Sequence, residues 1–288
     1  MRHVALLRVG PVTFRVGSAW PGPVKALRRL YNGYPDAAGE AADYSVRLEP
    51  ARPWRRWLRP SLAIAGDYVL PDAAPLPLAH GLVAAEMAMN LQMALGERRF
   101  LLLHAASVAR GDRAMILTGE SGAGKSTLSA MLGESGWRFF GDEFALLEPG
   151  SGLLHPFPRP VSLKNEAIAV MQALVPADRF GAAMEDTPKG RIRHMRPKAE
   201  ALARMDEPAR PALILFPRFG HERDVRPVGS AEAFMRLTQA STNYVALGER
   251  GFDALTGLVQ SCPAVAIDYP DAATASELIE LIWSELLR

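Results

Sequence analysis

One glycine-rich stretch constrains the fold of this chain more than any other feature, and it reads Gly119-Glu120-Ser121-Gly122-Ala123-Gly124-Lys125-Ser126-Thr127. It matches the pattern G-x-x-x-x-G-K-S, in which glycines let consecutive backbone N–H groups turn inward onto phosphates. The apolar run 114–118 before it is typical of a buried strand, and Leu128, Met131 and Leu132 after it recur at helical spacing. The sequence therefore predicts a strand, a phosphate-binding loop, and a helix whose N-terminus favours an anion.

The same pattern predicts the ligand of the loop. Residues 119–127 are expected to bind ATP through their backbone N–H groups, with Lys125 reaching the β and γ phosphates. The hydroxyl of Ser126 is expected to ligate Mg²⁺. ATP and Mg²⁺ are therefore the expected cofactors.

Two adjacent acids, Asp142 and Glu143, follow the loop after one predicted helix and one predicted strand. Their carboxylates are expected near the γ-phosphate, where phosphoryl transfer needs Mg²⁺ ligation and an acceptor for the proton of the attacking hydroxyl. On the other side, Gly111-Asp112 is a hairpin signal, so the strands 100–110 and 113–118 are expected to be antiparallel neighbours. His104 lies on the first of these strands, from which its imidazole could face the phosphates or the acceptor.

A strand histidine, a hairpin into the glycine-rich loop and an acidic pair at this distance together resemble HPr kinase/phosphorylase, a family related in its nucleotide site to phosphoenolpyruvate carboxykinase. The matched segment runs from about 101 to 147. The resemblance implies an α/β fold, with a P-loop kinase core whose sheet is mixed, and a smaller N-terminal α+β module. It stops short of the family's downstream Glu-x-Arg-Gly-x-Gly signature, which has no counterpart here.

The resemblance also implies catalytic roles for four residues. His104 matches the family's active-site histidine, Lys125 and Ser126 match its phosphate and Mg²⁺ residues, and the acidic pair matches two aspartates that accept a proton and bind metal. The resemblance places Asp142, at the end of the strand, toward the acceptor, so we expect it to be the general base. Glu143 is expected on or near Mg²⁺, because the next side chain of a strand points elsewhere. His104 is expected to orient the acceptor or offset charge.

The function implied by the resemblance is transfer of the γ-phosphoryl group of ATP to a serine, either of a protein or of a ribosomally made precursor such as a lasso peptide. One alternative is a small-molecule kinase of the shikimate or gluconate type, against which the hairpin bearing His104 argues. Another is a protein that binds ATP and recruits a partner without transferring phosphate, against which the two acids argue. A transport ATPase is disfavoured because no Leu-Ser-Gly-Gly-Gln signature occurs.

The 288 residues are expected to divide into a small α+β module over 1–75, a linker and helix over 76–96, and a catalytic domain over 97–288. In the module, strands are predicted on both sides of Gly10-Pro11, a helix over 23–31, a strand over 44–48, and a hairpin over 62–70 that turns at Gly66-Asp67. Further on, the patterns predict helices and strands over the ranges 78–95, 137–140, 160–163, 166–174, 212–216, 231–240, 252–260, 264–268 and 272–287.

The net charge of +2 gives no reason to expect nucleic acid or a membrane as partner, and the single cysteine, Cys262, suits a reducing cytoplasm. A homo-oligomer is possible.

Two basic stretches stand out. The first, 52–60, combines four arginines with two tryptophans and could cup an acidic peptide, although a solvated edge with the tryptophans folded onto the core is the favoured interpretation. The second, 188–198, contains Lys189, Arg191 and Arg193, which are candidates for completing the phosphate site. Lys164 and Asn165, earlier in the chain, are candidates for the same role.

Overall fold

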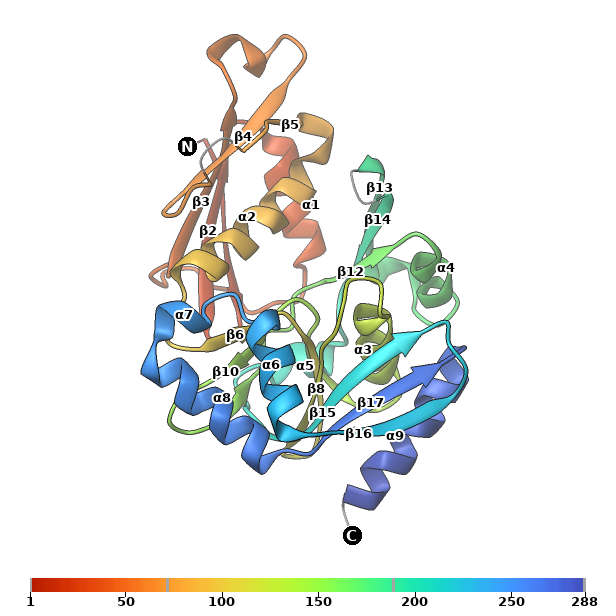
Figure 1. Cartoon of the computed structure of the whole chain (residues 1–288). Helices are drawn as coiled ribbons and strands as arrows, with labels where there is room; N and C mark the ends of the chain where they lie inside the picture. Colours follow the sequence, from red (N-terminus) through yellow and green to blue (C-terminus); the bar gives the residue numbers. More distant parts are fainter. Residues whose placement is uncertain (1, 71–72, 188–189, 287–288) are drawn as a thin grey trace.

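The chain folds into an N-terminal module stacked on a larger α/β core (Figure 1), in a computed structural model that describes residues 2–70, 73–187 and 190–286. The mixed α/β class expected from the sequence is confirmed. Within the described residues, no helix combines the length and apolarity that crossing a membrane requires.

A six-stranded mixed sheet forms the centre of the core, in the order β16 (Asp224–Val228), β17 (Ala264–Tyr269), β15 (Arg210–Phe219), β8 (Arg113–Leu117), β7 (Ala106–Arg110) and β9 (Arg138–Gly141). Strands β17, β15 and β8 are parallel, and the other pairings are antiparallel. The predicted hairpin at Gly111-Asp112 is confirmed, because Arg110 pairs with Arg113. An antiparallel strand therefore lies directly beside the strand that enters the glycine-rich loop.

Both faces of this sheet are covered, which explains why its central strands are apolar over 114–117 of β8 and 212–216 of β15. Met115 and Leu117 face α3 (Lys125–Glu134) and α9 (Ala272–Leu286). Ala114 and Ile116 face the other way, toward α6 (Ser230–Ala240), α8 (Glu249–Ser261) and a small sheet of β11 (Leu154–His155), β10 (Ala145–Leu147) and β6 (Leu101–Leu103). The short α7 (Tyr244–Leu247) packs against α8.

The N-terminal module is a five-stranded sheet with two helices on it, seen at the top of Figure 1. Its strands, in spatial order, are β1 (His3–Val9), β2 (Val12–Ser18), β3 (Tyr44–Pro50), β4 (Ser61–Gly66) and β5 (Leu76–Pro77). The helices are α1 (Pro21–Leu30) and α2 (Gly81–Gly96), and Met89 and Met93 of α2 are buried among the module's strands. Phe144 and Phe157 join the same hydrophobic cluster, so this core continues into the rest of the chain.

Another three-stranded sheet, of β12 (Val161–Lys164), β14 (Gly190–Met195) and β13 (Phe180–Thr187), lies between the module and the core (Figure 1). The chain around it forms α4 (Glu166–Gln172) and α5 (Ala199–Ala203), and three 3₁₀ turns occur elsewhere, at Pro53–Arg56, Leu78–His80 and Ala177–Arg179. Most of the second basic stretch is thus a strand, which the sequence analysis did not predict.

Two local predictions are wrong. The strand predicted over 100–110 is interrupted, and His104 lies in the break between β6 and β7, where its backbone N–H donates to the carbonyl of Ala240 at 2.7 Å. No hairpin turns at Gly66-Asp67, because β4 pairs along its length with β3 instead. The chain beyond Gly66 is fixed by α2, since the Gln92 amide exchanges two hydrogen bonds with the backbone of Tyr68, both of 2.9 Å.

Candidate active site

The glycine-rich loop turns tightly between β8 and α3. Gly122 and Gly124 both have φ of 90°, in the left-handed region that favours glycine. A Cβ atom on Gly124 would lie 2.6 Å from the hydroxyl of Tyr269, so only glycine fits there. The loop therefore has the tight backbone path and open N-terminal helix end that phosphate binding requires.

Lys125, the first residue of α3, folds its side chain back over this loop. Its Nζ donates to the carbonyls of Gly119 at 2.7 Å and Glu120 at 2.8 Å. Desolvation by burial lowers the pKa of the ammonium. The ammonium is thus held above the loop opening, where a bound phosphate would take over from the two carbonyls.

Asp142 follows β9 directly and lies against the start of α3. Its side chain accepts a hydrogen bond from the backbone N–H of Ser162 at 3.3 Å and interacts with the hydroxyl of Ser126. Burial, and after it the charge of Glu143, raises the pKa of Asp142 to about 7. The acid and the predicted Mg²⁺ ligand Ser126 are therefore in contact.

Glu143 stands beside His104, on the more open side of the site. Its Oε1 lies 3.8 Å from Nδ1 of His104, and both side chains are partly exposed. The structure thus brings together every catalytic residue predicted from the sequence. The two acids differ in environment, however, because Asp142 is buried and Glu143 is partly exposed to solvent.

A cleft of about 660 Å³ runs along the loop and the start of α3, past both acids. Phe219 and Tyr269, whose rings are 5.8 Å apart, also line it. A second cleft, of about 870 Å³, lies on the other side of the loop and shares His104, Ser121 and Gly122 with the first. The loop is therefore accessible from two sides.

A smaller pocket, of about 180 Å³, lies behind the acids, between α2 and the sheet of β12 and β14. Ser126, Asp142, Glu143, Ser162 and Lys164 line both this pocket and the larger cleft along the loop. The outer wall is contributed by the N-terminal module, through Val83, Met87 and Asn90 of α2. The pocket and the cleft along the glycine-rich loop thus meet at the two carboxylates.

Arg159 fastens this wall to the core. Its buried guanidinium pairs with Glu86, donates to the carboxamide of Asn90, and donates through Nε to the hydroxyl of Tyr31 at 3.2 Å. The same charge acts on Asp142 by lowering its pKa, against the stronger effect of burial. One arginine therefore connects α1 and α2 to the catalytic acids.

Two of the candidates for completing the phosphate site, Arg191 and Arg193, lie on one face of β14. Arg191 pairs with Glu185 at 2.8 Å, and Arg193 Nε donates to the carbonyl of Gly181 at 2.9 Å. Neither lines the catalytic clefts; the alternating residues Ile192 and His194 line the small pocket instead. Lys189 lies outside the described residues.

Lys164 and Asn165 do border the cleft. Asn165 has φ of 49°, a conformation that is costly for a residue with a side chain and that concentrates at functional sites. Its side-chain oxygen accepts a hydrogen bond from the backbone N–H of Arg191 at 3.2 Å. Of the basic candidates that the structure describes, Lys164 is thus the one at the site.

Sequence reasoning missed Arg159 and Tyr269. Tyr269 had a usable signal, because it directly follows the predicted strand 264–268, and ligands of α/β sheets bind beyond the carboxyl ends of parallel strands. Arg159 had none. Its position depends on helices far away in the sequence.

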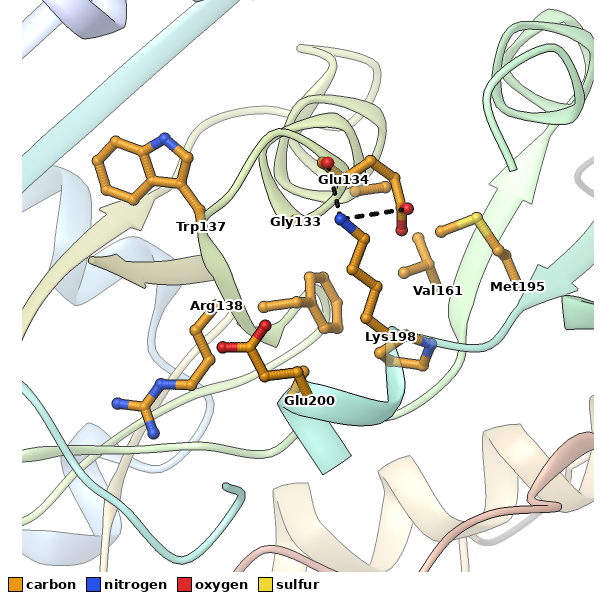
Figure 2. Close-up of a pocket in the computed structure, with 12 residues that line it drawn as sticks. Gly133, Glu134, Trp137, Arg138, Val161, Met195, Lys198 and Glu200 are labelled. Atoms are coloured by element: carbon orange, nitrogen blue, oxygen red, sulfur yellow. Dashed lines mark hydrogen bonds and ion pairs between the residues drawn. The ribbon is translucent and has the colours of Figure 1, made fainter. Parts of the chain in front are cut away.

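A tight pocket at the opposite end of α3 is structural (Figure 2). Its volume is about 10 Å³, room for about one water molecule. Lys198 reaches across it and donates to the backbone carbonyl of Glu134 at 2.7 Å, with its ammonium 3.7 Å from the Glu134 carboxylate, as the dashed lines of Figure 2 mark. A cation at a helix C-terminus stabilises the helix, so Lys198 anchors α3.

The donors at the loop fit a nucleotide with Mg²⁺. Gly122 has no atom within 4 Å of the position that a Cβ would take, so the loop is open there, and the hydroxyl of Ser126 interacts with the carboxylate of Asp142 at the helix start. Among the residues with described positions, no group of three or more His, Cys, Asp or Glu side chains could hold a metal ion. Mg²⁺ is usually bound by one or two carboxylates together with substrate phosphates, and needs no such group.

No protein-family model matches the chain, and no curated protein matches it. The assignment of function therefore depends on the site itself.

Proposed function

We propose that this protein is an ATP-dependent kinase of the HPr-kinase-related type that phosphorylates a serine hydroxyl of a protein or peptide. The observation that carries the proposal is that Asp142 and Glu143 line both the cleft along the glycine-rich loop and the separate pocket of about 180 Å³. A kinase needs this junction, because donor and acceptor must meet at the residues that promote transfer. A protein that only binds ATP does not need it.

Each residue then has a role. Lys125 offsets charge on the transferring phosphoryl group, and the contact between Ser126 and Asp142 favours Asp142 as the acid beside the metal. Ser126 and Asp142 would hold Mg²⁺, which would supply positive charge to offset that of the phosphates. Glu143, at 3.8 Å from His104, accepts the proton of the acceptor hydroxyl.

This division of roles reverses the one expected from the sequence. That expectation used strand alternation to point the two acids in different directions. Strand β9 ends at Gly141, however, so alternation does not apply to Asp142 and Glu143, and both border the same clefts. The contact of one acid with Ser126 is the better criterion.

The test is incubation with γ-labelled ATP, Mg²⁺ and two acceptor sets, serine-containing peptides and small polyhydroxy acids. We expect label on serine, lost in Lys125→Ala and in Glu143→Gln. Label on the small molecules alone would replace this proposal with a small-molecule kinase. Binding of MgATP without transfer to any acceptor would favour the non-catalytic alternative.

A kinase that uses ATP and carries one buried cysteine, Cys262, suits the cytoplasm, which we propose as its location.

A further inference from the structure

The basic turn between β3 and β4, residues 51–60, presents its tryptophans to solvent. The interpretation favoured from the sequence, with both rings folded onto the core, is wrong: Trp54 is 52% exposed and Trp57 is 76% exposed. Leu58 beside them is also exposed. In Figure 1 the turn is the loop beyond β4 and β5, at the end of the module farthest from the catalytic core. Exposed large apolar side chains gathered in one turn indicate an interaction surface.

The charge of this turn is one-sided. It contains four arginines and no acid, and none of the four guanidiniums pairs with a carboxylate of a described residue: Arg52, Arg55, Arg56 and Arg59. The guanidinium of Arg52 lies 5.5 Å from the ring centre of Trp54, and that of Arg56 lies 5.6 Å from the ring centre of Trp57. Each tryptophan is thus presented together with an arginine that keeps donors available for an anion.

The turn is held in shape by the rest of the module. Trp20, which precedes α1, donates through its indole N–H to the carbonyl of Arg56 at 3.0 Å. The backbone N–H of Leu78 donates to the carbonyl of Pro60 at 3.1 Å. Arg59 has φ of 45°, a disfavoured conformation for a residue with a side chain. A surface that is already ordered binds with a smaller entropic cost.

We propose that this turn is a docking site for an acidic, extended segment of a polypeptide partner. Carboxylates of the segment would pair with the arginines, and its apolar groups would pack on the exposed faces of Trp54 and Trp57. The proposal commits to a polypeptide rather than a membrane because inserting the tryptophans into acyl chains would draw their stacked arginines in as well, at high cost. It commits to a polypeptide rather than nucleic acid because the chain's net charge of +2 offers no wider basic track.

The location of the turn connects it to the proposed function, on which this last step rests. The same module contributes α2, whose Val83, Met87 and Asn90 form the outer wall of the pocket beside the catalytic acids. A peptide held at the turn by one segment would have a high effective concentration at that pocket. The turn would then select the substrate by a segment remote from the phosphorylated serine.

The test measures binding without ATP, by fluorescence anisotropy of a fluorescein-labelled 12-residue peptide of glutamate, glycine and leucine. We expect saturable binding at low salt that weakens as salt rises. The variant R52E/R55E/R56E should bind about tenfold more weakly, from about 0.5 kcal/mol for each exposed charge. Trp57→Ala, at a side chain too exposed to affect folding, should weaken binding about threefold.

The matched control is R15E/R113E/R250E, which makes the same change of charge at three exposed arginines elsewhere. It should bind nearly as well as wild type. Equal loss in both triple variants, or unchanged binding in Trp57→Ala, would overturn the proposal. So would preference for vesicles of 30% phosphatidylglycerol, or for a 12-nucleotide thymidine strand, over the peptide. Lys125→Ala should bind the peptide normally, so failure of the kinase proposal would leave this result readable.

Discussion

Replacing Asp142 by asparagine should make the metal-free protein more stable at alkaline pH. The wild-type carboxylate is 6% exposed, and its pKa is raised from 3.8 to about 7, first by burial and then by the charge of Glu143. Each pKa unit corresponds to 1.36 kcal/mol, so keeping Asp142 ionised above pH 7 costs roughly 4 kcal/mol of folding free energy. Asparagine removes that charge and still offers an oxygen to the Ser162 N–H.

The sign of the effect depends on pH. Because the folded pKa is raised, the stability contributed by Asp142 is fully present below the unfolded pKa near 4 and is lost as pH rises through about 7. The gain from Asp142→Asn should therefore be near zero at pH 4 and level off above pH 7. After allowance for weaker hydrogen bonds, we expect ~2–4 kcal/mol at pH 8, or about 3–7 °C in Tm.

The assay is urea unfolding in EDTA at pH 4.5, 6 and 8, followed by fluorescence and circular dichroism. Asp271→Asn is the control of opposite sign. Asp271 is exposed and accepts a hydrogen bond from the backbone N–H of Thr274 at 2.9 Å, and this bond lowers its pKa. The ionised Asp271 carboxylate stabilises the folded protein at pH values above its unfolded pKa, so Asp271→Asn should destabilise the protein at pH 8. A gain for Asp142→Asn that does not change with pH, or a loss at pH 8, would refute the reasoning.

Three further outcomes follow from the site and its supports. MgATP should raise the Tm of the wild-type protein. Lys125→Ala should abolish most of that rise, because the Lys125 ammonium is the cation held at the loop opening. An undiminished rise in Lys125→Ala would contradict the role of Lys125 in binding. Glu143→Gln should still bind MgATP, as measured by calorimetry, and should lower kcat of transfer by about 10²–10⁴-fold, the usual contribution of a general base. Asp142→Asn should instead raise the Mg²⁺ concentration needed for half-maximal rate. Lys198→Met should lower the free energy of unfolding by about 1 kcal/mol, because α3 loses its C-terminal cation, with nucleotide affinity unchanged; a loss of ATP binding would mean that this end of α3 is coupled to the loop.

The sequence by itself determined the parts of the site whose geometry is local. The glycines of 119–124 and the helix that follows can only form a tight turn into a helix N-terminus, and Gly111-Asp112 can only join neighbouring antiparallel strands. These patterns depend on backbone conformation over a few residues, so they predicted the loop, the hairpin and the mixed sheet. The resemblance to a kinase family stays a prediction for the labelled-ATP assay.

Tertiary structure decided what surrounds these parts. The alternation rule failed at Asp142 and Glu143 because the strand ends one residue earlier, and only packing against Ser126 and Ser162 separates a buried acid from an exposed one. The exposure of Trp57 could not be read from its sequence neighbours either, since arginine-flanked tryptophans occur both on cores and on surfaces. Arg159 reaches the site only because α1 and α2 fold onto the core. Burial and long-range charge are properties of neighbours in space, and a linear pattern of residues does not contain them.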